Sequence, residues 1–347
     1  MQAIRLETTG QLHARTVEKP TPGPGELLVR IEACGICGTD RHLYHGEFPA
    51  APPVTLGHEF SGIIEAVGPE VCDFQTGMRI TGDPNIACGR CSQCRRGRIN
   101  LCEKLQAIGI HRDGGFAEYV VMPQTQAYEI PLGLDPLHGA FCEPLACCLH
   151  GVDLAEIRTG ASVVVLGGGV IGLLVVQLAR LAGASRVVLV TRHPEKRRLA
   201  ESLGATATLD PSNGDPVAAI IAPTGLLPGG ADVVIECAGV EETVRQSTQM
   251  ARKGGTAVIL GVMPQGKTVA FEPFDILFRE LKLIGSFINP FTHRRAADLI
   301  ASGAVKVAPL ISRVISLDEA VEAITKPARS GEIRALVVPS TATVNDG

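Results

Sequence analysis

Four cysteines with metal-ligand spacing stand close together in the chain. They occur as C-x2-C-x2-C-x7-C, at Cys88, Cys91, Cys94 and Cys102. Four thiolates so close in sequence can close a tetrahedron around one Zn²⁺ at about 2.3 Å. The spacing implies no open coordination position, so it predicts a structural zinc site in a lobe of about residues 84–104. An iron–sulfur cluster and unligated thiols are the alternatives.

A glycine-rich loop predicts a dinucleotide site. The segment SVVVLGGGVIG reads as a strand, a G-x-G-x-x-G turn and an apolar helix. Gly167 permits the tight turn, Gly169 lets the backbone approach a pyrophosphate, and Gly172 lets the helix pack on the strand. The helix N-terminus offers free N–H groups and a positive dipole end to the phosphates. Further candidates for the cofactor site are Val170, Ile171 and Gly261. A purely structural glycine turn is the alternative.

The end of the next strand bears on the choice of cofactor. NAD-binding folds usually place an Asp or Glu there to hold the ribose 2′-hydroxyl. Here the strand ends at Thr191, with Arg192 directly after it and Lys196 about one helical turn further on. A guanidinium can hold a phosphate with two charge-assisted hydrogen bonds. We therefore predict a preference for NADP, with NAD as the alternative; in the simpler interpretation these cations form a solvated helix face.

A second set of metal-ligand residue types is scattered along the chain. It consists of Cys37, the adjacent His58 and Glu59, and Glu143. A single cysteine is usually a small core residue, and a His-Glu pair in a loop is usually solvated. Spacing alone therefore leaves a second metal site open.

The composition limits the class of protein that must position these residues. With 347 residues, the chain is expected to hold two domains at roughly 150 residues each. Apolar residues make up 45% and charged residues 20%, as in globular proteins, and the net charge of −4 argues against nucleic acid as the main partner. The start resembles no signal peptide, and the cysteine count is odd, so a reducing cytoplasm fits better than a disulfide framework. The apolar run 161–179 is interpreted as a buried strand, a glycine turn and a buried helix, so no membrane partner is expected.

Hydrophobic patterns divide the chain into two regions. Residues 1 to about 145 read as short strands bounded by Gly and Pro, for example 27–32 and 62–68. From about residue 160, apolar strand patterns alternate with helical patterns, which predicts βαβ units on a parallel sheet covered on both faces. The expected strands are 163–166, 187–190, 233–236, 257–261 and 281–287, and the expected helices are 171–182, 195–203, 241–251 and 292–302.

With these motifs in place, the chain resembles the zinc-dependent members of the medium-chain dehydrogenase/reductase superfamily, most closely the polyol (sorbitol), threonine and butanediol dehydrogenase branch. The resemblance covers nearly the whole chain. It rests on segments 35–40, 57–62, 67–68, 114–119, 143–145, 167–172, 285–287 and 297–303, and on the four-cysteine lobe.

The resemblance implies a fold and a set of roles. It implies a GroES-like β-barrel catalytic domain, residues 1–150 and 290–347, interrupted by a Rossmann domain, residues 151–289, with the active site in the cleft between them. Cys37 and His58 would bind a catalytic zinc, and Glu59, Glu143 or each in turn with water would complete its shell, with Glu143 preferred. Thr39 would take the proton from the alcohol and His42 would pass it towards water.

The function expected from this resemblance is transfer of a hydride between a secondary alcohol or polyol and NAD(P). Relatives in this branch are usually tetramers, so a homotetramer is expected. The alternatives are a zinc-independent quinone or enoyl reductase of the same superfamily, and a non-enzymatic zinc/dinucleotide redox sensor or nucleic-acid-binding module. One sequence does not reveal the substrate, because specificity depends on loop side chains that line the cleft.

Overall fold

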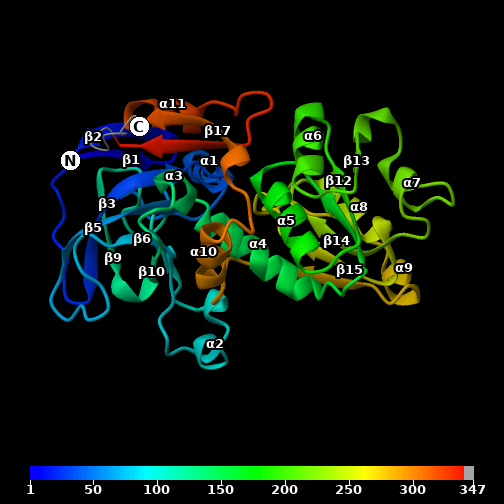
Figure 1. Ribbon diagram of the computed structural model, residues 1–347, viewed down its shortest axis with the longest axis horizontal. Helices are drawn as coiled ribbons and strands as arrows, with labels where there is room; N and C mark the ends of the chain where they lie inside the picture. The colour runs from blue at the N-terminus through cyan, green and yellow to red at the C-terminus, as the bar shows by residue number, and fades with distance from the viewer. Residues whose placement is uncertain (340–347) are drawn as a thin grey trace. The chain divides into compact units, whose positions relative to one another are not determined.

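A computed structural model describes residues 1–339 (Figure 1). The chain divides into two compact units: Met1–Pro144 together with the chain from His293 onwards, and Leu145–Thr292. All eleven cysteines are free thiols. Within the described residues, the helices are too short or too polar to cross a bilayer.

The first unit is built on sheets that are antiparallel except for the parallel pair β17 and β18. Its largest sheet has the strand order β10-β6-β5-β3-β18-β17, with β9 also paired to β3. These strands are β3 (Glu26–Gly35), β5 (Glu59–Val67), β6 (Arg79–Gly82), β9 (Tyr119–Pro123), β10 (Ala127–Glu129), β17 (Ile311–Ser316) and β18 (Arg334–Val338). A second sheet joins β1 (Gln2–Thr8), β2 (Gln11–Thr16) and β4 (Val54–Thr55), and β7 (Asn85–Ile86) pairs with β8 (Gln106–Ala107).

The interior of this unit explains the strand pattern. Alternate residues of β3 and β5 are buried in one apolar cluster that includes Val29, Ile31, Phe60 and Ile64. This burial of one side-chain face fixes the register between the two strands. The helices of the unit are α1 (Gly38–His45), α2 (Ser92–Arg95), α3 (Pro136–Gly139), α10 (His293–Ala301) and α11 (Leu317–Thr325). Helix α4 (Cys142–Ala155) carries the boundary between the units.

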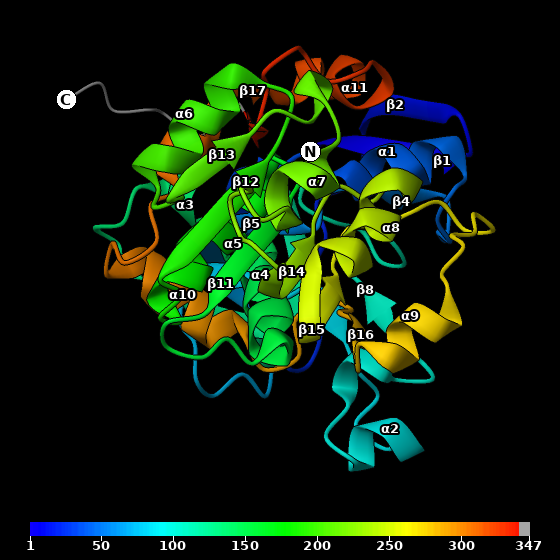
Figure 2. The same ribbon diagram turned by 90° about the vertical axis from the view of Figure 1, so that its right-hand side faces the viewer.

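The second unit is a parallel sheet with helices packed on it (Figure 2). Its strand order is β13-β12-β11-β14-β15-β16, and every pairing is parallel. The strands are β11 (Ser162–Leu166), β12 (Arg186–Val190), β13 (Ala207–Leu209), β14 (Ala231–Glu236), β15 (Ala251–Ile259) and β16 (Lys282–Gly285). The helices are α5 (Val170–Leu181), α6 (Pro194–Ser202), α7 (Pro216–Ile221), α8 (Glu241–Met250) and α9 (Pro273–Phe278).

The predicted fold class is confirmed. Along the chain, strands β12 and β13 follow β11 on one side of the sheet, and strands β15 and β16 follow β14 on the other side. This is the doubly wound arrangement. Right-handed crossovers in opposite directions place their helices on opposite faces of the sheet. The apolar run 161–179 forms β11, the glycine turn and α5, as interpreted from the sequence.

Candidate functional site

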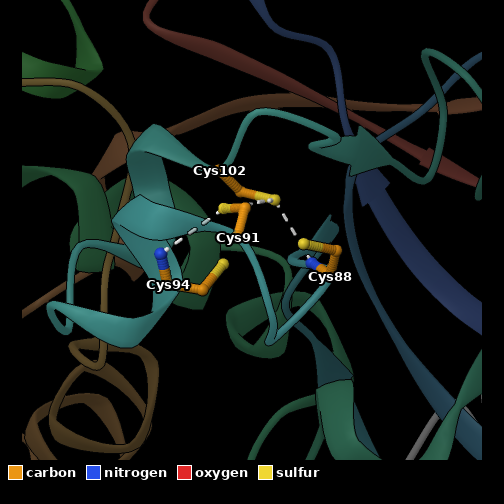
Figure 3. A group of neighbouring side chains, drawn as sticks. All are labelled: Cys88, Cys91, Cys94 and Cys102. Carbon is orange, nitrogen blue, oxygen red and sulfur yellow. Dashed lines mark hydrogen bonds between the residues drawn. The ribbon is translucent and has the colours of Figure 1, made fainter.

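The four cysteines of the lobe converge on one point. Their sulfur atoms all lie within 4.8 Å of one another (Figure 3). A tetrahedral zinc with Zn–S bonds of about 2.3 Å requires sulfur atoms about 3.8 Å apart, and Cys91 Sγ lies 4.0 Å from Cys102 Sγ. The lobe can therefore hold one four-coordinate zinc ion after only a small contraction.

Backbone N–H groups favour thiolates in this lobe. The N–H of Cys88 donates to Cys102 Sγ at 3.2 Å, and the N–H of Cys94 donates to Cys91 Sγ at 3.5 Å. The N–H groups of Cys94 and Glu103 lower the pKa of Cys91 to about 6, whereas burial and the neighbouring thiols raise the pKa of Cys94 to about 12. Cys91 is also the N-cap of α2, where the helix dipole favours a negative charge. The residues thus fit a metal that binds thiolate sulfur.

The second group contains Cys37, His58 and Glu59. One ligand atom from each lies within 4.8 Å of the others. Two neighbouring strands bring them together: Cys37 follows the end of β3, and Glu59 begins β5, where it stands opposite Gly35 in the register. A Cβ atom built on Gly35 would lie 2.3 Å from Glu59 Oε2, so the glycine leaves the space that this carboxylate occupies.

An aspartate that the sequence analysis did not single out connects two of these residues. Asp40 is fully buried, and its Oδ2 accepts the N–H of Cys37 at 2.8 Å. Its Oδ1 lies 3.5 Å from His58 Nδ1. Burial opposes a charge on His58, but Asp40 and Cys37 outweigh it and raise the pKa of His58 well above its ordinary value. Because Nδ1 faces the carboxylate, Nε2 is the nitrogen left for a metal.

An arginine from the far end of the sequence completes this group. Arg334, the first residue of β18, is 4% exposed, and its Nη1 lies 3.1 Å from Glu59 Oε2. The same nitrogen donates to the carbonyl of Ile36. Strand β18 lies next to β3 in the sheet, so three neighbouring strands carry the site.

The hydrogen bonding of this group is incomplete in a way that fits a cation. Among the described residues, Asp40 Oδ1, His58 Nδ1 and Glu59 Oε2 are buried side-chain atoms without a hydrogen bond, although Glu59 Oε2 forms the ion pair with Arg334. Buried polar atoms without partners are costly and need an explanation. A Zn²⁺ ion held by Cys37, His58 and Glu59 would neutralise the carboxylate and draw the imidazole N–H towards Asp40.

The remaining predicted residues of this unit lie in different places. Glu143 is 7% exposed and engaged in an interaction, but it does not belong to the group of Cys37, His58 and Glu59. Thr39 Oγ1 lies 3.6 Å from Cys37 Sγ. His42, at the end of α1, lies with Nδ1 2.6 Å from Glu47 Oε2.

The glycine loop has the geometry of a phosphate site. Gly167 has φ +109°, a region that favours glycine, and a Cβ on Gly172 would lie 1.9 Å from the carbonyl oxygen of Gly167. Gly169 is the N-cap of α5, and no side chain bonds to the first N–H groups of this helix. The N–H groups of Val170 and Ile171 are therefore presented to a ligand. Gly261 lies just beyond β15, with its N–H bonded to the carbonyl of Glu236.

The cations after β12 have different surroundings. Thr191 is 7% exposed and packs on Gly168, because a Cβ atom built on Gly168 would lie only 2.7 Å from Thr191 Oγ1. Arg192 is exposed, and Lys196 is partly buried and engaged in an interaction. Arg197 donates to the carbonyls of Thr191 and Arg192 at 2.8 and 2.9 Å and pairs with Asp210 at 3.0 Å. Arg197 therefore fixes the loop, whereas Arg192 is available to a ligand.

Comparisons with known proteins agree with both units. Residues 23–132 match the family described as Alcohol dehydrogenase GroES-like domain, and residues 170–302 match Zinc-binding dehydrogenase. A sorbitol dehydrogenase from Halalkalibacterium halodurans is 34% identical over 98% of this chain and 99% of its own length. D-arabinitol dehydrogenase 1 from Uromyces fabae is 31% identical over 98% and 97%. A crystal structure of a zinc-binding dehydrogenase from Sinorhizobium meliloti 1021 bound to NADP is 68% identical, with a TM-score of 0.96 over 97% of this chain and 99% of that chain.

Proposed function

The chain belongs to the zinc-dependent medium-chain dehydrogenase/reductase superfamily, in its polyol dehydrogenase branch, and from this premise we propose that it interconverts a polyol or related secondary alcohol and the corresponding ketone with NADP. It is an oxidoreductase that acts on CH–OH groups. The observation that carries the proposal is the group of Cys37, His58 and Glu59, which offers one ligand atom from each residue within 4.8 Å of the others.

We propose that Cys37, His58 and Glu59 hold the catalytic zinc and that Cys88, Cys91, Cys94 and Cys102 hold the structural one. Glu143 remains a candidate for the same shell after a movement of its side chain. When bound, zinc supplies a Lewis acid for the alcohol oxygen and NADP supplies a hydride acceptor. Asp40 orients the His58 ring, and Arg334 holds the carboxylate of Glu59 in place.

Two residues of α1 supply the path for the proton. We propose that the Thr39 hydroxyl accepts the proton of the substrate hydroxyl as it releases its own proton towards His42, and that His42 then gives a proton to water. Thr39 lies beside Cys37, and His42, three residues further along the same helix, is partly exposed. Glu47 binds His42 Nδ1 and so leaves Nε2 for the transfer.

The preference for NADP rests on the end of β12. The strand ends at Val190, the residue after it is Thr191 rather than a carboxylate, and the exposed Arg192 can bind the 2′-phosphate. The cofactor of the Sinorhizobium meliloti relative supports this assignment. The zinc-independent reductase is not favoured, because the chain matches a zinc-binding family and carries the Cys37 group.

We also propose a cytoplasmic homotetramer. Free thiols at all eleven cysteines suit a reducing compartment. An apolar surface on α9, formed by Phe274, Leu277 and Phe278, is 63 to 74% exposed and precedes the edge strand β16. Exposed apolar surfaces beside an open sheet edge are suited to contact with a second copy.

A panel of polyols, sugar alcohols and secondary alcohols, assayed with NADP and with NAD, tests the function. We expect turnover with a member of the panel, and two zinc ions per chain by metal analysis. His58→Ala should lose one zinc and turnover but keep NADPH binding, because the glycine loop belongs to the other unit. A wild-type protein that binds NADPH but turns over no alcohol would contradict the proposal and favour the redox sensor. Near-normal turnover of His58→Ala would contradict the zinc mechanism.

A further inference from the structure

Glu236 is a buried carboxylate that the proposed chemistry does not use. It is the last residue of β14 and is 0% exposed. In the sheet register it stands between Leu166 at the end of β11 and Ile259 at the end of β15. It therefore lies where three neighbouring strands run into their loops.

Its two oxygen atoms face different loops. Oε1 accepts the N–H of Ala238 at 2.7 Å, the N–H of Gly239 at 2.9 Å and the hydroxyl of Thr243 at 2.8 Å. In the described part of the chain, Oε2 has no hydrogen-bond partner, and a Cβ on Gly261 would lie 2.7 Å from it. Burial raises the pKa of Glu236, while these donors lower it. The carboxylate thus ties the loop after β14 to the loop after β15.

The loop after β14 also contacts the glycine loop. A Cβ on Gly167 would lie 3.0 Å from the nitrogen of Ala238, and a Cβ on Gly239 would lie 2.3 Å from the carbonyl oxygen of Val262. Three loops therefore pack against one another around Glu236, with no room for an added methyl group.

These loops lie at the place where a parallel sheet binds its ligand. The strand order reverses between β11 and β14, and ligands of such sheets bind outside the carboxyl ends of the strands at this point. The phosphates belong at the N-terminus of α5 and the adenosine ribose at the end of β12. The nicotinamide half then falls to the β14 and β15 side.

Resting on the proposed function, we propose that Glu236 is a positioning residue for the nicotinamide half of the cofactor. It contacts no substrate and no cofactor. It holds residues 237–239 and 261–262 in the arrangement that receives the nicotinamide ribose, and it contributes nothing to the adenosine half.

The test measures the affinity of the Glu236→Gln variant for two ligands. The first is NADPH, and the second is 2′,5′-ADP, which carries only the adenosine half with its 2′-phosphate. Glutamine keeps the shape and the Oε1 acceptor, but it removes the negative charge and places an NH₂ group at the position of Oε2, beside Gly261. We expect NADPH to bind about 10-fold more weakly to the variant than to wild type. The fluorescence emission of bound NADPH should move towards that of free NADPH. The affinity for 2′,5′-ADP should stay within about twofold of wild type.

Two further variants make the test specific. Thr243→Val removes a bond to the same carboxylate from α8 and should leave both affinities unchanged. Gly261→Ala places a Cβ 2.3 Å from the nitrogen of Gly239, so it should reproduce the NADPH defect even if Glu236→Gln does not fold. Unchanged NADPH affinity in the folded variants, or equal loss of both ligands, would overturn the inference. A wild-type protein that binds neither ligand would overturn the proposed function together with it.

Discussion

Asp40 joins Cys37 and His58 through one carboxylate, and this contact gives a sharp prediction at the residue scale. Asp40→Asn keeps the shape but removes the charge that orients the imidazole. We expect zinc affinity of the Cys37 group to fall about 10- to 100-fold, as is typical for partners of metal-binding histidines. Competition with a chelator measures this. Asp113→Asn, which changes a surface aspartate of the same unit, should leave zinc affinity unchanged, and wild-type zinc affinity in Asp40→Asn would contradict the assignment.

A second residue-scale prediction concerns the choice of cofactor. Thr191→Asp with Arg192→Leu should reverse the preference from NADP to NAD. Each hydrogen bond to a charged group contributes about 1.5–3 kcal/mol, so one or two bonds to the 2′-phosphate favour NADP by roughly 10- to 100-fold or more. The measurement is kcat/KM for both cofactors with one substrate. Arg198→Leu removes an exposed arginine of α6 and serves as the control. A wild-type preference for NAD would refute the claim.

Some of the candidate site was accessible from the sequence, and some was not. Spacing alone predicted the four-cysteine lobe, because all its ligands lie on one short segment. Residue type singled out Cys37, His58, Glu59 and Glu143, and the resemblance assigned them to one zinc with Glu143 preferred over Glu59. Asp40 did leave a local signal, since a carboxylate three residues after an N-cap is typical of a capping box. Arg334 left none, because only the pairing of β18 with β3 brings it to Glu59.

At the scale of elements, the cysteine lobe folds around a ligand set rather than around an apolar core. Its helices are α2, of four residues, and the 3-10 turn Ile99–Leu101, and neither buries a residue. Short segments of this kind are stable only with external support. The proposed zinc would be that support, because metal binding is linked to folding.

Cys94→Ala tests this dependence. We expect loss of one zinc per chain and a lower melting temperature, because three thiolates cannot close the tetrahedron. Metal analysis and thermal unfolding measure the two effects. Cys72→Ala, which removes an exposed free thiol, is the matched control and should change neither. A Cys94→Ala protein with full zinc content and an unchanged melting temperature would rule out the structural site.

Helix α10 begins at a histidine that must stay neutral. His293 is fully buried, stacks on Tyr128 at 4.8 Å and lies with Nε2 3.3 Å from Thr81 Oγ1. Burial lowers its pKa to about 3, with a smaller contribution from Arg294. The unfolded chain then binds a proton at a higher pH than the folded chain does. Stability is therefore complete above pH 6.5 and is lost as the pH falls towards 3.

The expected loss from this one group is about 2 kcal/mol between pH 7 and pH 5. Denaturant unfolding at several pH values measures it. His293→Gln should flatten the dependence in this range, whereas His13→Gln, at an exposed position of β2, should not. A wild-type and a His293→Gln protein with equal slopes would refute the prediction.

Pattern length explains which elements between β11 and β16 could be predicted, whereas the longer helices α4 and α11 were not predicted either. The helices α5, α6 and α8 match expected patterns because each has at least two turns of regular periodicity. The strand β13 and the helices α7 and α9 were not predicted, since three to six residues hold too few periods. Strand β18 carries an apolar run and β17 does not, and both gain their place only by pairing across the sheet.

For the whole molecule, the exposed apolar surface of α9 predicts association. The double variant Leu277→Glu with Phe278→Glu should lower the mass of the oligomer. Each pair of copies would then bring four negative charges into the contact between them. Light scattering after size-exclusion chromatography measures the mass. Phe291→Glu, at an exposed phenylalanine outside α9, is the control. A wild-type monomer, or an unchanged mass in the double variant, would refute this interface.

The ion pair between Glu59 and Arg334 has a consequence for biosynthesis. The proposed zinc ligands Cys37, His58 and Glu59 leave the ribosome early, but the arginine that holds Glu59 lies in the last described strand. At about 5–20 residues per second, the early segment waits roughly tens of seconds for its partner. Until then Glu59 has no counter-charge, and the nascent site is a cluster of exposed thiol, imidazole and carboxylate. A ribosome-bound chain that stops before β18 should therefore exchange zinc freely, and release of the complete chain should lock the ion in place.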